Sequence, residues 1–404
     1  METVELNWRC AFWSPPETPL SLHVYCTQTR QCTLSDIAEK NSEFLAAVET
    51  LDSGKAISLA RGDVAAVVST LRYYAGWADK LEGKTIDIDP DMLHYTRPEP
   101  LGVCIVMKTA EQTPLSALVF TQFNEQAGFP AGVFNLVSGF GRVVGAAISS
   151  HMGIDKIMKE AAASNLMKVT LELGGKSPNV IFNDADIESA VTWANIGIYY
   201  NQGQTCAAGS RILVQEGIYD KFVATFKERT LQNEVGDPFD EQSFQGPQIS
   251  QLQYDRIMGY IKSGKEEGAT LVTGGGRVGT KGFFILPTIF TDVGPDMKIM
   301  REEIFGPVCA IAKFKDEAEA IQLANDTNFA LASAVHTTNL DTAIRVSNAI
   351  EAGTVWINCY NKMHFALPVG GFKESGIGQE LGEAALANYT QNKSVAIQLQ
   401  PKRH

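Results

Sequence analysis

Cys206 is a candidate nucleophile because of the residues that surround it. In the stretch YYNQGQTCAAGSR its neighbours are small or carry amide side chains, whereas a packing cysteine usually has apolar neighbours. Such a segment leaves backbone N–H groups and space for a second molecule. A cysteine thiolate can form a covalent intermediate when a base, a cation or an amide-rich pocket lies near it. The alternative is a small buried residue that has no chemical role.

Glu172 is the candidate base. In VTLELGGKSPNV it is predicted to end an apolar strand, directly before the paired glycines Gly174 and Gly175. No histidine lies near Cys206 in the sequence, so a carboxylate is the next choice. A carboxylate in apolar surroundings has a raised pKa and can act as a general base. The alternative is a strand-end glutamate paired with Lys176. The two glycines are also predicted to form a hinge between two lobes.

Two glycine-rich stretches are candidates for phosphate binding. GGGRVG has the spacing of a dinucleotide fingerprint, but the extended stretch TKGFFILP follows it, so a surface turn is predicted. SGFGRVVG lies between a predicted strand and a predicted helix, where the N–H groups of a helix start attract phosphate. Its spacing departs from the fingerprint, which leaves both a nucleotide contact and a simple turn open.

Strand and helix patterns alternate along the chain and would position these residues. Short apolar runs predict strands, and apolar residues at helical spacing predict helices between them. The strands are predicted at 102–108, 132–138, 179–182, 211–215, 330–338 and 354–358, and the helices at 114–128, 183–195 and 217–230. This order implies an α/β fold with a parallel sheet. Residues 85–100 alternate and break at prolines, as an edge strand or hairpin does. The first thirty residues show no clean periodicity.

Composition limits the class of protein. The chain has 404 residues, 45% of them hydrophobic, and a net charge of −12, which indicates a soluble protein of two or three domains that does not bind nucleic acid. Its 7 cysteines include no C-x-x-C pair, so we expect a reducing compartment, the cytoplasm, with a mitochondrial location left open. Scattered histidines argue against a metal site, and no apolar run is long enough for a membrane span.

Six ordered motifs resemble one family. LELGGKSPN and NQGQTC, together with MKTAEQTP, GFPAGVFNLVSGFG, EEIFGPV and GGFKESGIGQELG, resemble the NAD(P)-dependent aldehyde dehydrogenases. The resemblance runs from about Leu34 to Gln398 and is nearest to the broad-substrate, non-phosphorylating, fungal-like members. It implies two Rossmann-like α/β lobes plus an oligomerisation strand segment. The implied parts are a cofactor-binding domain at 1–174 with oligomerisation strands inserted at 85–100, a catalytic domain at 175–385 and an oligomerisation tail at 386–404.

The resemblance also implies a reaction. Cys206 would attack a small-molecule aldehyde, a hydride would pass to NAD, and Glu172 would activate the water that releases a carboxylic acid. Lys108 and Glu111 would hold the adenosine ribose, and the Glu111 carboxylate would favour NAD over NADP because it repels a ribose phosphate. The relatives assemble through the strands named above, so a homodimer or homotetramer is implied.

Three further residues take cofactor roles from the resemblance. Leu173 would line the nicotinamide pocket, while Glu303 and Phe305 would position the nicotinamide ribose and ring. Without the resemblance, Glu303 would be interpreted as a solvated charge on a helix.

The chain departs from the family at three places. PLGVC runs directly into IVMK, where relatives carry a segment with a Trp-Asn-Phe core whose asparagine is the second oxyanion donor. Loss of one such donor costs about 3 kcal/mol of transition-state stabilisation. GIDKI runs directly into MKEAAASN, without the helix start that binds the pyrophosphate. The first thirty residues do not resemble the usual amino-terminal segment.

These departures leave alternatives open. Each internal join removes part of the cofactor-binding lobe and spares Cys206 and Glu172. The chain could therefore be a weakened aldehyde dehydrogenase, an esterase-like remnant that works without a cofactor, or a structural subunit without activity. The abrupt joins suggest the hypothesis that the sequence comes from exon skipping or from an error in the gene annotation.

Overall fold

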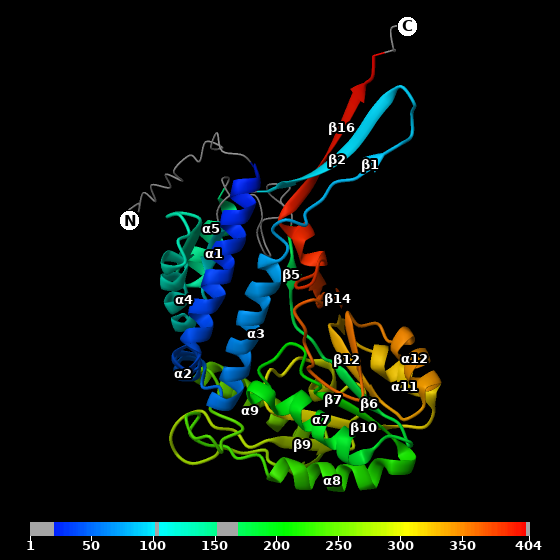
Figure 1. Cartoon of the computed structure of the whole chain (residues 1–404). Helices are drawn as coiled ribbons and strands as arrows, with labels where there is room; N and C mark the ends of the chain where they lie inside the picture. The colour runs from blue at the N-terminus through cyan, green and yellow to red at the C-terminus, as the bar shows by residue number, and fades with distance from the viewer. Residues whose placement is uncertain (1–19, 102–104, 152–168, 401–404) are drawn as a thin grey trace. The chain divides into compact units, whose positions relative to one another are not determined.

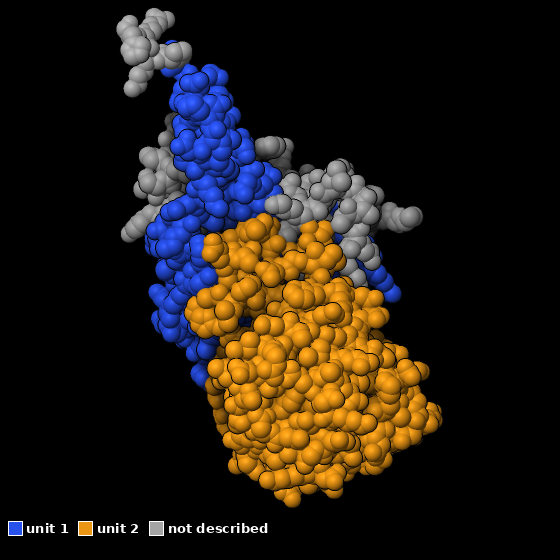
Figure 2. Space-filling view, turned by 90° about the vertical axis from the view of Figure 1, so that its right-hand side faces the viewer, with its two compact units in different colours: residues 1–45, 64–155, 389–404 blue, residues 46–63, 156–388 orange. Residues whose placement is uncertain are grey.

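The computed structural model describes residues 20–101, 105–151 and 169–400. The chain forms two compact units, coloured separately in Figure 2. Unit 1 comprises 1–45, 64–155 and 389–404, and unit 2 comprises 46–63 and 156–388. Both abrupt joins of the sequence involve residues outside the described ranges. The two units therefore interleave along the chain, because each draws on segments that are far apart in sequence.

Unit 2 contains a seven-stranded sheet, and the predicted parallel architecture is confirmed there. Six neighbouring strands are parallel, and the edge strand β8 is antiparallel to β9. In spatial order the strands are β13 (Thr354–Ile357), β12 (Ala332–His336), β6 (Pro178–Ile181), β7 (Arg211–Gln215), β10 (Val308–Phe314), β9 (Thr288–Thr291) and β8 (Thr270–Thr273).

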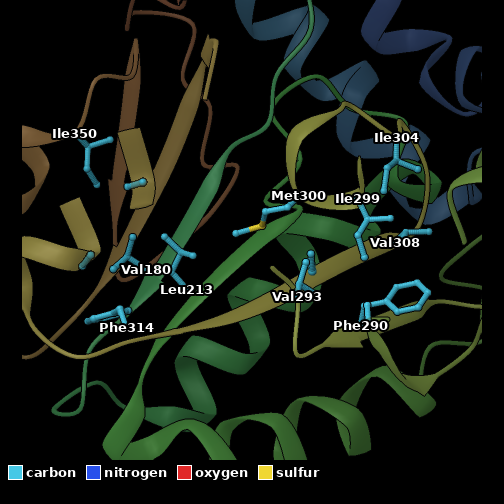
Figure 3. Close-up of a cluster of buried hydrophobic side chains, with 14 of the residues drawn as sticks. Val180, Leu213, Phe290, Val293, Ile299, Met300, Ile304, Val308, Phe314 and Ile350 are labelled. Carbon is cyan, nitrogen blue, oxygen red and sulfur yellow. The ribbon is translucent and has the colours of Figure 1, made fainter. Parts of the chain in front are cut away.

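Helices cover both faces of this sheet. Successive side chains of the central strands point to opposite faces, and because both sets are apolar, both faces must be covered. Val180 and Leu213 face one hydrophobic cluster, and their neighbours Ile181 and Ile212 face the other. Helices α7 (Ile187–Tyr199) and α8 (Tyr219–Leu231) cover the second face. The first face is covered by α9 (Gln251–Glu266), α10 (Lys298–Arg301), α11 (Glu317–Asn325) and α12 (Leu340–Ala349). Figure 3 shows the first cluster, and Figure 1 the helices around the sheet.

Smaller strands complete unit 2. Strand β5 (Leu171–Glu172) pairs with β15 (Gly376–Ile377), and β11 (Phe329–Ala330) pairs with β14 (Phe372–Lys373), both antiparallel. Residues 46–63 add the end of α2 (Ser42–Ser53) and the start of α3 (Ile57–Ala75).

Unit 1 contains a strand–helix–strand motif, as the sequence predicted. Strand β3 (Ile105–Lys108) runs parallel to β4 (Phe134–Val137), and α4 (Leu115–Gln126) connects them. A π-helical turn at Gly141–Gly145 then leads into the short helix α5 (Ala146–Ser150).

A long antiparallel arm also belongs to unit 1. Strand β2 (Met92–Pro100) pairs with β16 (Thr390–Gln398) along its full length, and β1 (Thr85–Ile86) pairs with the other edge of β2. The two segments that resemble oligomerisation strands are therefore partners of one another. Lys393 and Glu99 form an ion pair across the arm at 2.6 Å.

Helix α1 (Leu20–Lys40) begins in a stretch where the sequence indicated no regular element. Its apolar residues do not recur on one face over most of its length, which is why periodicity missed it. Towards its end Leu34 and Ala38 are buried, and the Ser35 hydroxyl donates to the Val68 carbonyl of α3 at 3.0 Å. No helix in the described part of the chain is long and apolar enough to cross a membrane.

Candidate active site

The residues that precede three adjacent strands of unit 2 come together. Strands β6, β7 and β10 are neighbours, and their register aligns Pro178, Arg211 and Ala310. The segments just before these residues, 172–175, 204–206 and 303–306, must therefore meet at the amino ends of the strands. This juxtaposition brings Cys206 and Glu172 into one site, although they lie in different segments of the sequence.

Close backbone packing joins the three segments. A side chain at Gly175 would collide with the backbone carbonyl of Cys206, and one at Gly174 would collide with the Glu303 carboxylate. The Gly175 N–H donates to Glu303 Oε1 at 3.0 Å. The paired glycines therefore allow close approach of Cys206 and Glu303, which is a different role from the hinge that the sequence suggested.

The loop that carries Cys206 has a strained backbone. Asn201 and Gln202 adopt φ values of 51° and 58°, followed by Gly203 at 71°. A non-glycine residue in this left-handed region costs about 1–2 kcal/mol, so surrounding contacts must hold the loop in place. Gly203 packs directly against the backbone of Gly306, where a side chain would not fit.

Hydrogen bonds from the rest of unit 2 hold this loop. The Tyr360 hydroxyl, on a buried ring, donates to the Ala207 carbonyl at 2.9 Å. The Gln204 side chain accepts from the Ile249 N–H at 3.0 Å. These contacts fix the backbone on both sides of Cys206.

Helix α9 supports the third segment. Arg256 donates to the Glu303 carbonyl at 2.9 Å, and Gln253 donates to the Phe305 carbonyl at 2.7 Å. Phe305 has a φ of 56°, an uncommon conformation for a bulky residue. The backbone that carries both residues is thus held in a defined, strained shape next to Gly174 and Gly175.

Electrostatics connect Cys206 to the two carboxylates. Burial raises the pKa of the Cys206 thiol, and the negative charges of Glu172 and Glu303 raise it further, whereas the N–H groups of Ala207 and Cys206 lower it. Burial likewise raises the pKa of Glu303, against the Gly175 N–H, Arg256 and Lys176, which lower it.

Glu172 ends a strand directly before the paired glycines, as the sequence predicted. That strand is the two-residue β5, which pairs opposite Gly376 and lies outside the main sheet. Glu172 is exposed to solvent in part. Partial burial of the carboxylate raises the pKa of Glu172, and the negative charge of Glu380 raises it further.

The alternative ion pair between Glu172 and Lys176 does not form. Lys176 is buried, and its Nζ has no hydrogen-bond partner among the residues that the structure describes. Burial and Arg211 lower the pKa of Lys176 to about 7, while Glu303 acts in the opposite direction. Leu173, which follows Glu172 in the chain, is half-buried. Its N–H donates to the Ser375 carbonyl at 2.9 Å.

The two predicted ribose contacts lie together in unit 1. The Lys108 Nζ donates to the Thr109 carbonyl at 2.7 Å, and its stem lies near Gly145. The Glu111 carboxylate is exposed and accepts from the Gly141 N–H. The stretch SGFGRVVG thus contributes an N–H group to Glu111, and a turn followed by a short helix forms there as predicted.

The residues present fit NAD in two places. In unit 1 the Lys108 stem lies near Gly145, and the Glu111 carboxylate accepts from the Gly141 N–H, so an ammonium and a carboxylate that can bind ribose hydroxyls adjoin the same turn. In unit 2 the Glu303 carboxylate lies against Gly174, where a side chain would displace it. The predicted pyrophosphate segment falls within 152–168, outside the described residues.

Sequence reasoning missed the residues that hold the site in place. Tyr360 and Gln253 bind the loops of Cys206 and Phe305 from positions far away in the chain, and their spacing carries no signal. The left-handed conformations of Asn201 and Gln202 were equally hidden, although asparagine before glycine-rich sequence is a weak sign of such a turn.

A half-buried thiol thus lies near two carboxylates, before adjacent strands of a parallel sheet, and this combination is typical of enzyme sites that use a covalent cysteine. The profile of the Aldehyde dehydrogenase family matches residues 28–107 and 104–395. The chain belongs to the aldehyde dehydrogenase family and is an oxidoreductase that acts on aldehydes. The two matched segments overlap at residues 104–107, and the first abrupt join of the sequence lies within this overlap.

Relatives and solved structures agree with this assignment. An aldehyde dehydrogenase of Emericella nidulans is 58% identical over an alignment of 404 positions. The alignment covers 91% of this chain and 81% of the relative. The horse mitochondrial aldehyde dehydrogenase is 48% identical over 91% of this chain and 82% of its own length. The NAD+ complex of a Bacillus cereus aldehyde dehydrogenase has a TM-score of 0.93 at 42% identity, covering 97% of this chain and 87% of that one. The predicted fold is therefore confirmed.

Proposed function

We propose that this chain oxidises an aldehyde to a carboxylic acid with NAD, through a thiohemiacetal and then a thioester on Cys206. The observation that carries the proposal is the meeting of Cys206, Glu172 and Glu303 before three adjacent strands. Cys206 is the nucleophile because it is the thiol in this site. Its own backbone N–H is the donor for the oxygen that becomes negative when sulfur attacks the carbonyl carbon.

Glu172 acts as the base in this proposal. Its raised pKa places its basicity closer to neutral pH than that of an ordinary glutamate. It accepts a proton from the water that attacks the thioester carbon. The carbon–sulfur bond then breaks, the carboxylic acid leaves, and Cys206 is regenerated as a thiolate.

Five residues would hold the cofactor. Lys108 and Glu111 bind the adenosine ribose, and Glu303 binds the nicotinamide ribose. Phe305 positions the nicotinamide ring, and Leu173 lines the pocket of that ring. NAD, when bound, supplies the hydride acceptor. The Glu111 carboxylate favours NAD over NADP, because a ribose phosphate beside it would be repelled. We assign 1–174 to cofactor binding and 175–385 to catalysis.

The proposed assembly is a homodimer or homotetramer, with 85–100 and 386–404 as the contact strands. Leu93 and Ile397 are paired across the arm and both are exposed, which supports a surface that a second copy covers. We propose a cytoplasmic location, since Cys32, Cys206, Cys309 and Cys359 are all free thiols. The mitochondrion is the alternative location, because one relative is named as mitochondrial.

Activity is expected to be impaired. The alignment with the Emericella relative extends over 404 positions but takes in 91% of this 404-residue chain, so the relative has residues that this chain lacks. If the missing segment carries the second oxyanion donor, the rate falls by about a hundredfold or more. An esterase-like remnant is the second candidate, because Cys206 and Glu172 are both retained.

Three measurements on the purified protein separate the candidates. NADH production with an aldehyde tests the proposed oxidation, hydrolysis of an activated aryl ester tests the remnant, and a nucleotide-induced shift of the melting temperature tests cofactor binding. Ester hydrolysis without NADH production and without a shift would favour the remnant. A negative result in all three assays would favour a structural subunit and overturn the proposed function.

A further inference from the structure

A partly buried hydrogen-bond network connects residues 54–63 to the loop of the proposed nucleophile. All of its members belong to unit 2. The Tyr200 hydroxyl donates to Asp63 Oδ1 at 2.6 Å. Asp63 Oδ2 forms an ion pair with Lys55, which is buried and lies over the Tyr200 ring at 5.7 Å from its centroid. Tyr200 immediately precedes the strained residues Asn201 and Gln202.

A second contact connects the same two segments. The Gln202 side chain donates to the Gly54 carbonyl at 2.7 Å and to the Pro247 carbonyl at 3.1 Å. Gln202 is itself almost fully buried. The two residues that flank Asn201, Tyr200 and Gln202, are thus tied to residues 54–63 by direct hydrogen bonds.

We propose that Lys55, Asp63 and Tyr200 form a positioning network that holds the left-handed loop and thereby places the Cys206 sulfur beside Glu172 and Glu303. The loop needs such a restraint because Asn201, Gln202 and Gly203 are all in the left-handed region. The hydrogen bond from a phenol to a carboxylate is of the charge-assisted kind, and Lys55 forms an ion pair with the same carboxylate. The role rests on Cys206 as the proposed nucleophile.

The electrostatic surroundings of Tyr200 agree with a fixed donor. Burial and the negative charge of Asp63 raise the pKa of Tyr200, and Glu49 adds to this effect. Lys55 faces the same carboxylate from the other side. The hydroxyl therefore stays protonated and keeps donating to Asp63 throughout the neutral range.

The test removes only the hydroxyl, with Tyr200→Phe. Tyr199→Phe is the control: the neighbouring Tyr199 is fully buried, and its hydroxyl contacts the Thr288 carbonyl at 3.4 Å and Cys309 Sγ at 3.7 Å, not residues 54–63. Iodoacetamide alkylation of the peptide that contains Cys206 is followed by mass spectrometry from pH 6 to 10. Melting temperatures show whether each variant folds.

Release of the loop should move the sulfur away from burial and from the two carboxylates, which are the groups that raise its pKa. In Tyr200→Phe the alkylation profile should therefore shift to lower pH, with a rate at pH 7.5 at least about twofold above the parent. Aldehyde turnover should fall at the same time. Tyr199→Phe should leave the alkylation profile unchanged.

A second variant protects the conclusion. Asp63→Asn retains an acceptor of the same shape but loses the charge, so its effect should lie between the parent and Tyr200→Phe. The double variant should show no larger effect than Tyr200→Phe alone, because both changes break one network. An alkylation profile in folded Tyr200→Phe that equals the parent profile would overturn the proposal. Alkylation is measurable without NAD or aldehyde, so failure of the proposed function would not be confused with failure of the network.

Discussion

The backbone carbonyl of Cys206 lies directly against Gly175, where no Cβ would fit. The group that a Cβ at Gly175 would meet is the backbone of Cys206, which cannot rotate away as a side chain can. The neighbouring Gly174 faces the end of the Glu303 side chain instead. Two adjacent glycines thus make room for two different functional groups, and substitutions at them should have separable effects.

Gly175→Ala should displace the Cys206 loop. We expect destabilisation of about 1–3 kcal/mol, as for other overpacked positions, and at least about a tenfold loss of turnover. Gly174→Ala should instead push the Glu303 carboxylate aside, so NAD affinity should fall while the alkylation rate of Cys206 stays as in the parent. Equilibrium unfolding, nucleotide titration and alkylation measure these three properties. Equal alkylation by Gly175→Ala and the parent would contradict the assigned contact.

Glu380→Gln should change the pH dependence of the reaction. Glu380 raises the pKa of Glu172, so removal of its charge lowers that pKa. Glu172 must be ionised to act as a base, and the acid limb of the pH–rate profile should therefore move to lower pH. Steady-state rates of ester hydrolysis or aldehyde oxidation across pH 5 to 8 test this. Glu374→Gln, a change at another glutamate of the same segment, is the control and should leave the limb in place.

Lys176→Met should remove a pH dependence of stability. The folded pKa of Lys176 is about 7 against an ordinary value of 10.5, so the unfolded chain holds more protons between these values. The free energy of unfolding contributed by this group therefore rises as the pH increases from 7 to about 10.5. Replacing a buried, unpartnered ammonium by an apolar side chain should add about 1–4 kcal/mol at pH 7 and less at pH 10.

Denaturant unfolding of both proteins at pH 7 and pH 10 measures that difference. Lys265→Met, at a lysine near the end of α9, provides the control. A gain in Lys176→Met that is the same at both pH values would mean that burial does not lower the pKa of Lys176.

Sequence alone predicted the central strands and selected Cys206 and Glu172 as candidate site residues. The runs around Val180, Leu213 and Val335 are short, apolar and flanked by polar turns, so strand length and periodicity suffice to find them. Cys206 and Glu172 could be selected because their local sequence is unusual for a packed core. Helix α1 was missed because little of it has an apolar face, and its fold depends on tertiary contacts such as that between Ser35 and Val68.

The geometry of the site could not be predicted from single positions. Glu172 ends a strand as predicted, but the partner of that strand, near Gly376 and about two hundred positions later, could not be predicted. The roles of Gly174 and Gly175 depend on which groups approach them, and these groups come from other segments. Long-range contacts of this kind leave no periodic trace in a sequence.

The central claim is that Cys206 carries the acyl group and Glu172 releases it. The most direct measurement uses Glu172→Gln, incubated with an aldehyde and NAD, quenched in acid and analysed by peptide mass spectrometry, with Cys206→Ala treated in parallel. The account predicts an acyl adduct on the Cys206 peptide, formed with release of one NADH per adduct and persisting longer than in the parent, and no adduct or NADH in Cys206→Ala. An acyl group on a different cysteine, or NADH formation by Cys206→Ala, would contradict it.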